Sequence, residues 1–425
     1  MRAHGGLSFL TLEDESGAIQ IALQRNNLPT NYDFLINNLD RGDFIEAKGI
    51  LFLTHKGEKT LDAREIRMLA KSLLPLPEKW HGLSDTELRY RQRYLDLIAN
   101  PDVRQTFRVR SVIVKSIRDF LNKKGFVEVD TPILQPLYGG ANARPFVTHH
   151  NALDTDLYLR IAPELYLKRL LVGGFEKVYE IARCFRNEGI DHSHNPEFTQ
   201  VEFYWAYSDY RALMKLTEKM LAFIAKMVNP SLEFEFDKKK FSLKPPFRVR
   251  TYRDIVFEHT NIDINKIRER DELAKEAQKF GIEISKSDGW PRILDEIFKK
   301  KVRVNIVEPT FVIDYPLELS PLAKKKNKNT VERFQLIAAG IELCNAFSEL
   351  NDPLDQEERF KEQEKASEAG DEEAQRMDDD YITALKHGMP PSSGFGMGID
   401  RLTMLLTNNH SIKEVILFPT LKPEK

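Results

Sequence analysis

The sequence predicts an α+β protein, with a β-rich N-terminal domain and a larger domain in which helices flank a sheet. Residues 7–69 hold short runs of alternating apolar residues around one helical stretch, a pattern typical of a small β-domain. Apolar residues between 104 and 122 then recur at helical spacing, and a strand follows them. Residues 178–205 are predicted to form two strands joined by a polar loop.

The N-terminal domain, residues 1–70, is expected to be a small β-barrel. Short strands with one helix between them suit a barrel such as an OB-fold. A generic β-hairpin appendage is the alternative that the pattern leaves open. The expected strands are Leu7–Leu12, Ile19–Leu23, Phe44–Thr54 and Thr60–Met68, and the expected helix lies near Asp33–Leu39.

The rest of the chain divides into a linker, residues 71–96, and a domain over residues 97–425. Pro75, Pro77 and a charged run indicate the linker. The helix over 104–122 ends in cations and a glycine, and a strand at 126–129 follows. Most of the region around 210–325 is expected to be a largely helical insertion, and the highly charged stretch 357–379 is expected to be a solvated helix.

The composition bounds the classes of function. A net charge of −2 over 425 residues argues against holding nucleic acid by bulk charge alone, although a local basic face remains possible. Two cysteines, Cys184 and Cys344, supply neither a disulfide framework nor a zinc site, so a reducing, cytoplasmic setting is expected. Every apolar run is shorter than the ~20 residues that cross a bilayer, and the N-terminus lacks a signal peptide. We therefore expect a soluble, untargeted protein without membrane contact.

The predicted hairpin at 178–205 carries the most chemistry. Its first strand ends at Arg186, and the polar loop 187–197 follows. Period-two alternation places Glu202 and Tyr204 on one face of the return strand. An arginine can hold a carboxylate or a phosphate through two parallel hydrogen bonds. The alternative is a solvated hairpin with a surface salt bridge.

Three other segments are suggestive but have equally plain structural explanations. Residues 394–401 are rich in glycine, yet their third glycine comes too early for a dinucleotide-binding fingerprint. Residues 342–352 gather acids that can bind a metal with phosphates or meet a cationic substrate. Residues 138–146 hold adjacent glycines typical of a lid or a close backbone approach.

Together the four segments resemble the class II aminoacyl-tRNA synthetases, over nearly the whole chain from Leu7 to Pro423. The resemblance implies an antiparallel catalytic sheet flanked by helices. Residues 104–132 are similar to motif 1, the dimer-interface element. Residues 186–204 are similar to motif 2, and residues 396–401 to motif 3. Four further stretches resemble the lysine-specific members of the family: residues 76–83, 139–146, 160–170 and 345–352.

The resemblance implies an ATP-dependent ligase that activates L-lysine to lysyl-adenylate with release of pyrophosphate, then transfers lysine to the 3′ end of its tRNA. It implies Arg186, Glu188 and Arg401 as catalytic residues, with Arg186 bridging the lysine carboxylate and the α-phosphate. The ATP-binding residues it implies are Arg186, Glu188, His194, Asn195, Phe198, Glu342 and Arg401. The lysine-binding residues it implies are Gly140, Glu164, Arg186, Glu202, Tyr204, Asn345, Phe347 and Glu349. A buried lysine ammonium requires such paired carboxylates.

The resemblance also implies a metal, a tRNA partner and a homodimer. Glu342 matches a ligand of Mg²⁺, and Gln335 stands at a second metal position that is usually glutamate. An amide oxygen can still coordinate Mg²⁺ but adds no negative charge. Phe9 and Gln20 match positions that read the lysine anticodon by stacking and hydrogen bonding. The usual first strand of the barrel is missing from the sequence, which implies an exposed sheet edge.

Two other functions remain open at this stage. A paralogue that lysylates a protein lysine would lack the barrel, so residues 7–69 count against it. A degenerate, non-catalytic RNA-binding protein would have lost catalytic residues, whereas Arg186, Glu188, Glu342 and Arg401 are all present.

Overall fold

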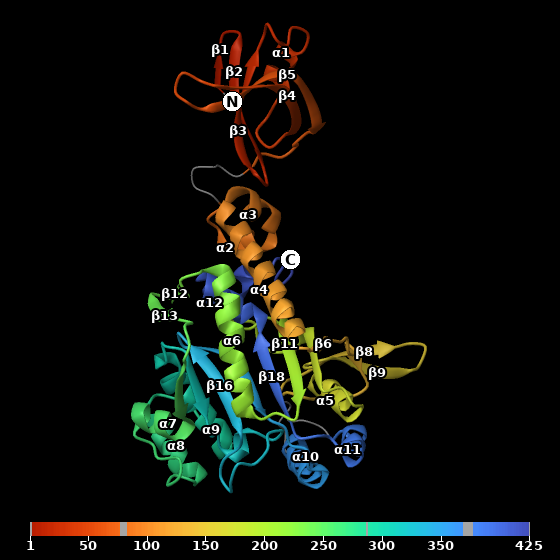
Figure 1. Ribbon diagram of the computed structural model, residues 1–425, viewed down its shortest axis with the longest axis vertical. Coiled ribbons are helices and arrows are strands. Elements are labelled where there is room, and N and C mark those ends of the chain that lie inside the picture. Colours follow the sequence, from red (N-terminus) through yellow and green to blue (C-terminus); the bar gives the residue numbers. More distant parts are fainter. Residues whose placement is uncertain (1, 77–82, 286–287, 369–376, 425) are drawn as a thin grey trace. The chain divides into compact units, whose positions relative to one another are not determined.

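The computed structural model describes residues 2–76, 83–285, 288–368 and 377–424, and it confirms the mixed α and β fold class (Figure 1). The chain divides into two compact units, Met1–Pro101 and Asp102–Lys425. Most of the expected lysine-specific stretch 76–83 and residues 369–376 of the charged segment lie outside the described residues. None of the described helices is long and apolar enough to cross a membrane.

The first unit holds a five-stranded sheet in the order β1-β2-β3-β5-β4. Its elements are β1 (Arg2–His4), β2 (Leu7–Asp14), β3 (Gly17–Gln24), α1 (Tyr32–Asn38), β4 (Phe44–Leu53) and β5 (Lys59–Ala70). Alternate residues such as Ile21 and Leu23 point into a small core with Tyr32 and Ala63. The four longer strands and α1 match the predicted ranges to within about three residues, because alternation and turn residues fix them locally.

The segment predicted as a linker contains two helices, α2 (Thr86–Arg91) and α3 (Arg93–Ala99). The Asp85 side chain accepts a hydrogen bond from the Leu88 amide and caps α2. Charged residues of this segment pair with one another. Asp96 is fully buried and binds Arg93 at 2.5 Å and Arg89 at 2.8 Å, which gives these short helices a fixed polar interior.

The second unit is organised around an eight-stranded sheet in the order β14-β15-β16-β17-β18-β11-β10-β6. The interior pairs are antiparallel, as expected, but the edge pairs β14–β15 and β6–β10 are parallel. Both parallel pairs are connected through long segments that contain helices, as parallel neighbours require. The strands are β6 (Val127–Glu128), β10 (Lys177–Phe185), β11 (Glu197–Ala206), β14 (Arg248–Thr251), β15 (Thr310–Ile313), β16 (Arg333–Ala338), β17 (Ile341–Ser348) and β18 (Ser392–Gly398).

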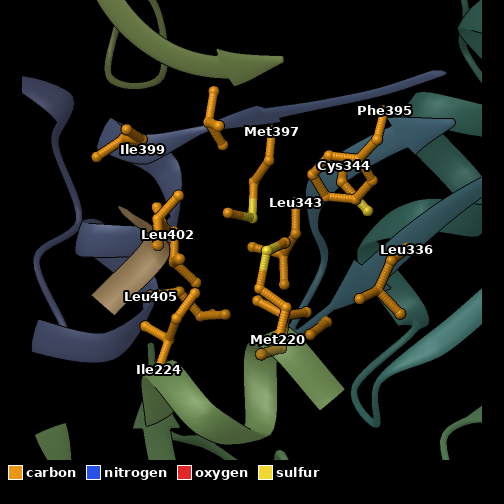
Figure 2. Packing of buried hydrophobic residues seen from close by; sticks show 14 of the residues in the cluster. Met220, Ile224, Leu336, Leu343, Cys344, Phe395, Met397, Ile399, Leu402 and Leu405 are labelled. Atoms are coloured by element: carbon orange, nitrogen blue, oxygen red, sulfur yellow. The ribbon is translucent and has the colours of Figure 1, made fainter. Parts of the chain in front are cut away.

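One face of this sheet is covered by α4 (Pro101–Lys123), α6 (Tyr210–Val228) and α12 (Ile399–Thr407), which share one apolar cluster with the strands. Figure 2 shows Met220 of α6 and Leu402 of α12 packed near Met397 of β18. Phe203 and Phe395 stack within the cluster with centroids 4.5 Å apart. The core therefore occupies one face and leaves alternate side chains of the strands free to face the other way.

The segment around 210–325, expected to be a largely helical insertion, also supplies β14 and β15 of the main sheet. Its helices pack around a second apolar cluster that includes Tyr252, Ile293 and Phe298. Besides α6, its elements are β12 (Glu233–Phe236), β13 (Lys239–Ser242), α7 (Tyr252–Thr260), α8 (Arg270–Lys279), α9 (Trp290–Ile297), a π-helix (Phe298–Val302) and 3₁₀ turns at Arg303–Asn305 and Leu317–Leu319.

The remaining elements surround the other face and the ends of the sheet. A three-stranded sheet has the order β7-β9-β8. The elements are β7 (Leu134–Gln135), β8 (Phe146–His150), β9 (Thr155–Leu159), α5 (Glu164–Val172), α10 (Pro353–Glu368), α11 (Asp379–Lys386) and a 3₁₀ turn (Ile412–Glu414). Helices α5 and α11 share a third apolar cluster, which includes Leu167 and Tyr381.

Candidate active site

A cavity of about 310 Å³ lies on the face of the main sheet that the large core leaves free. Gln200, Glu202 and Tyr204 of β11 line it, while Val201 and Phe203 between them belong to the core. The predicted alternation along this strand is therefore confirmed. The cavity brings together residues from all four segments singled out in the sequence.

Nearly all predicted lysine- and ATP-binding positions line the cavity. They are Gly140, Glu164, Arg186, Glu188, His194, Asn195, Phe198, Glu202, Tyr204, Glu342, Asn345, Phe347 and Arg401. Glu349 lies just behind the wall, and Gln335 does not reach it. We call the part formed by Glu164, Glu202, Tyr204 and Glu349 the closed end, and the part formed by Glu188, His194 and Arg401 the open end.

Glu202 is the central acid of the closed end and is only 6% exposed. Its carboxylate accepts hydrogen bonds from Gln200 Nε2 at 2.7 Å and from the Tyr204 hydroxyl at 3.1 Å. Burial, together with the negative charge of Glu164, raises the pKa of Glu202 to about 8. A cation that enters this end would therefore restore the charged form of Glu202.

Two glycines allow the wall of the closed end to form. Gly140 has φ +85°, and a Cβ there would lie 2.8 Å from the Cβ of Glu164. A Cβ on Gly394 would lie 2.1 Å from Glu349 Oε1. Both contacts are too short for any larger residue. Gly140 of the predicted lid and Gly394 of the C-terminal glycine-rich run thus leave room for the buried acids beside the cavity.

The closed end includes a cation that the sequence predictions missed, Lys168 of α5. Its Nζ lies 2.5 Å from Glu164 Oε1 and 2.5 Å from Glu349 Oε2. Lys168 is fully buried and does not line the cavity. The spacing of Glu164 and Lys168, four residues apart, is a sequence signal for that pair, but Glu349 joins them only through the fold.

Arg186 lines the cavity and directly follows β10. Its guanidinium stands 5.0 Å from the ring centroid of Phe198 on β11. Its amide donates a hydrogen bond to the Pro196 carbonyl at 2.8 Å, which closes the intervening loop. Arg186 Nε is buried and has no partner among the described residues. This cation is held in place yet keeps hydrogen-bonding capacity for a ligand.

The open end is more exposed. His194 Nδ1 lies 2.8 Å from Asp191, and its Nε2 lies 3.2 Å from Arg401 Nη2. The His194 side chain is 48% exposed. Asn195 also lines the cavity, but its side chain donates to the Glu197 carbonyl and accepts from the Thr420 amide, which indicates a role in shaping the loop.

Asp400 is a second residue that the sequence predictions missed, although it directly precedes Arg401. It accepts a hydrogen bond from the Thr199 amide at 2.8 Å and pairs with Arg110 of α4 at 2.6 Å. Asp400 is buried at the start of α12. These contacts tie the helix that carries Arg401 to β11 and to α4.

The two predicted metal positions differ in the structure. Glu342 lines the cavity, with Arg303 Nη1 3.7 Å away. Gln335 instead uses its Oε1 to accept a hydrogen bond from the Tyr315 hydroxyl at 2.7 Å. Within the described parts of the chain, no three acidic, histidine or cysteine side chains form a metal cluster. The residues present fit a cation held by one carboxylate together with phosphates and water.

The two predicted anticodon residues lie in the N-terminal unit. In the β2–β3 register, Phe9 pairs with Ala22, and Thr11 pairs with Gln20. Phe9 and Gln20 therefore share the face opposite the small core. Gln20 Oε1 accepts a hydrogen bond from Thr60 Oγ1 at 2.9 Å, which leaves its amide nitrogen for another partner.

Comparisons with known proteins agree with this geometry. A family model described as tRNA synthetases class II (D, K and N) matches residues 85–422, and one described as an OB-fold nucleic acid binding domain matches residues 1–69. The chain is similar to the lysine–tRNA ligase of Carboxydothermus hydrogenoformans, at 53% identity over 99% of this chain and 87% of that protein. It is similar to those of Clostridium tetani, at 51% over 99% and 85%, and Helicobacter hepaticus, at 49% over 100% and 82%.

Proposed function

The chain belongs to the class II tRNA synthetases (D, K and N) and has the activity of an ATP-dependent lysine–tRNA ligase, and we propose that its cavity is where lysine and ATP react. The observation that carries this proposal is the arrangement of charge. Buried acids form one end of the cavity, the other end includes His194 and Arg401 beside Glu188, and Arg186 lines the same cavity. That order matches lysine, with its ammonium groups, joined to the phosphates of ATP.

The closed end is proposed to bind lysine. An ammonium taken out of water needs carboxylates and hydrogen bonds to replace its hydration. Glu202 and Glu164 face the cavity, and Glu349 stands behind Gly394. The pocket walls are proposed to be completed by Gly140, Tyr204, Asn345 and Phe347.

Arg186 is proposed to hold the lysine carboxylate against the α-phosphate of ATP. A carboxylate oxygen attacks the α-phosphorus, the bond to the bridging oxygen breaks, and pyrophosphate leaves. The tRNA ribose hydroxyl then attacks the carbonyl carbon of the adenylate and AMP leaves. The protein accelerates both steps by positioning and by stabilising negative charge, and no side chain need act as nucleophile.

ATP is proposed to lie along the open end. Phe198 already accepts a guanidinium on one face of its ring, and the adenine base would stack in the same region. Glu188, His194 and Asn195 surround that space, and Arg401 would meet the γ-phosphate. The contact between His194 and Arg401 would orient both side chains toward the phosphates.

Mg²⁺ is proposed to accompany ATP and to be held by Glu342. Bound there, it would offset negative charge on the phosphates. Glu342 offers a carboxylate at the cavity wall, and Mg²⁺ commonly takes one or two protein carboxylates with phosphates and water. Gln335 is left out of this proposal because Tyr315 occupies its oxygen.

The N-terminal unit is proposed to read the lysine anticodon through Phe9 and Gln20. A homodimer is proposed to form through the segment that follows α4. Val127, Ile133 and Leu134 in this segment are 44–48% exposed, and a partner subunit would cover such apolar side chains. Since the reaction serves protein synthesis, the cytoplasm is the proposed place of action.

Amino-acid-dependent exchange of pyrophosphate into ATP, followed by charging of tRNA, tests the proposal. We expect exchange with lysine and transfer to tRNA with the lysine anticodon. Absence of exchange with any amino acid would contradict an active site in this cavity. Exchange without tRNA charging would contradict the second step and favour lysylation of another acceptor.

A further inference from the structure

The fully buried Lys168 has no part in the reaction described above. It lies on α5, one turn after Glu164, and reaches across to Glu349. Its Nζ also stands 5.5 Å from the ring centroid of Phe347 and 6.0 Å from that of Tyr381. Since it is absent from the cavity wall, any influence on a substrate must act through Glu164 and Glu349.

With Arg186 included, the closed end has a definite charge when its groups are ionised, which for Glu202 and Glu349 is above about pH 8. Glu164, Glu202 and Glu349 contribute three negative charges, while Lys168 and Arg186 contribute two positive ones. The neighbouring buried pair of Arg160 and Glu180, 2.5 Å apart, adds no net charge. One net negative charge remains. Free lysine, with two ammonium groups and one carboxylate near neutral pH, carries one net positive charge.

Without Lys168, two carboxylates would share a buried space with no cation between them. Like charges in a low-dielectric interior cannot both stay ionised, so the pair would retain a proton. Burial disfavours the charged form of Lys168, but Glu164 and Glu349 outweigh it and hold the pKa of Lys168 well above its usual value. The internal cation thus pairs with both carboxylates before a substrate arrives, and for Glu349 it opposes the effect of burial, which raises the pKa of that carboxyl to about 8.

We infer that Lys168 is a positioning residue for lysine specificity, which fixes Glu164 and Glu349 and limits the closed end to the one net negative charge that lysine neutralises. This inference rests on the proposed function of the cavity. Glu349 Oε1 has no hydrogen-bond donor among the described residues and lies against Gly394 of the wall. Lys168 binds the other oxygen, so the free one stays directed at the cavity side.

The test compares Lys168→Met with the unmutated chain in lysine-dependent pyrophosphate exchange. We expect the KM for lysine at pH 7 to rise about tenfold or more, as for a shift of one pKa unit. The KM for ATP should stay within about twofold, because the open end is untouched. Arg169→Met is the matched control. It removes the next cation on α5, which binds Asp378 and Asp380 away from the cavity, and should leave the KM for lysine unchanged.

The pH dependence gives a readout that a structural role would not move. In the unmutated chain, burial raises the pKa values of both Glu202 and Glu349 to about 8, so log kcat/KM for lysine should rise between pH 6.5 and 8.5 with a slope between one and two. In Lys168→Met, loss of the cation that lowers the pKa of Glu349 should raise that pKa further, so the slope should stay steep to higher pH. The charged and titratable groups that act on Lys168 and the three acids are Glu164, Glu180, Glu202, Glu349, Tyr204, Tyr381 and Arg186. Arg169 acts on Tyr381.

Lys168→Gln guards against failure of the methionine variant to fold. Its amide can still donate a hydrogen bond to Glu164, while its charge is lost. An unchanged KM for lysine and an unchanged slope in this variant would overturn the inference, as would equal rises in the KM for lysine and for ATP. Absence of exchange in the unmutated chain would instead overturn the proposed function, so the two failures are distinguishable.

Discussion

The two ends of the cavity are expected to bind charged groups in different ways. At the closed end, Glu164, Glu202 and Glu349 are each no more than 6% exposed, and either Lys168 or Gln200 contacts each of them before any substrate binds. At the open end, the side chains of His194 and Asp191 are about half exposed. The closed end is therefore built for selectivity, because buried charge penalises every wrong ligand.

At the open end, water and the phosphates of ATP can balance the charges of the side chains. Charges that stay hydrated contribute little to binding one by one, so the nucleotide must be held by many weak contacts. This contrast predicts large effects of substitution at the closed end and at Arg186, and small ones at the open end.

The largest effect is expected from Arg186→Ala, which removes the group that joins the two ends. The exchange rate should fall about 10²–10³-fold, as for loss of a group that stabilises transition-state charge. Arg183→Ala is the matched control, since Arg183 lies on β10, the strand that Arg186 follows, is 46% exposed and pairs at 3.4 Å with Glu197. Similar losses in both variants would refute a special role for Arg186.

Glu202→Gln tests the closed end alone. Loss of a charged, buried partner of an ammonium should cost about 2 kcal/mol, so the KM for lysine should rise roughly thirtyfold while the KM for ATP stays constant. Steady-state exchange with each substrate varied in turn measures both values. Glu197→Gln, on the same strand but 49% exposed, is the control and should change neither KM value. An equal rise in the KM for ATP in Glu202→Gln would contradict the distinction between the two ends.

The pH profile sharpens the same distinction. The pKa of Glu202 is raised to about 8 by burial and by Glu164, so below that pH the carboxyl is protonated and cannot pair with an ammonium. As pH rises from 6.5 to 7.5, kcat/KM for lysine should increase by up to about tenfold. The kcat/KM for ATP should not follow. Glu202→Gln should reduce the rise for lysine without abolishing it, because burial also raises the pKa of Glu349 to about 8. A profile for lysine that falls with rising pH would contradict the assignment.

Phe9 belongs to neither end of the cavity, so Phe9→Ala should weaken tRNA charging and leave pyrophosphate exchange unchanged. Loss of one base–aromatic stack costs about 1 kcal/mol or more, so tRNA charging should lose about fivefold in kcat/KM while lysine-dependent exchange is unchanged. Phe34→Ala, an exposed phenylalanine in the same unit, serves as control. An equal loss of exchange would show that Phe9 acts on the stability of the protein.

The smallest effect is expected at the open end, from His194→Ala. Half-exposed charged groups contribute up to about 1 kcal/mol, so the KM for ATP should rise no more than about fivefold and the KM for lysine should hold. Exchange at varied ATP measures it. A hundredfold rise would mean that the open end closes over ATP and excludes water, which would remove the contrast between the ends.

The sequence predicted what depends on local periodicity and what the family resemblance supplied. Alternation along β11 correctly separated Glu202 from the core residue Phe203. The central pairing of Lys168 with Glu349 could not be predicted, because 181 positions separate these residues and only the fold brings α5 close to the residue that follows β17. For Gln335, residue chemistry alone allowed a role as a metal ligand. Only the structure shows that its side-chain oxygen accepts a hydrogen bond from Tyr315.

The pairing of the edge strands of the main sheet also could not be predicted from the local sequence pattern. Strands β14 and β6 are only four and two residues long, too short for an alternation signal to establish their direction. Their parallel pairing follows from the long connections that bring them to the sheet, which a search for hairpins does not detect.

A crystal structure with a non-hydrolysable lysyl-adenylate analogue tests the division of the cavity most directly. We predict both ammonium groups of the lysyl part at the closed end among Glu164, Glu202 and Glu349, with Arg186 at the phosphate and adenine against Phe198. A lysyl side chain directed toward His194 and Arg401, or an analogue bound outside the cavity, would contradict the account.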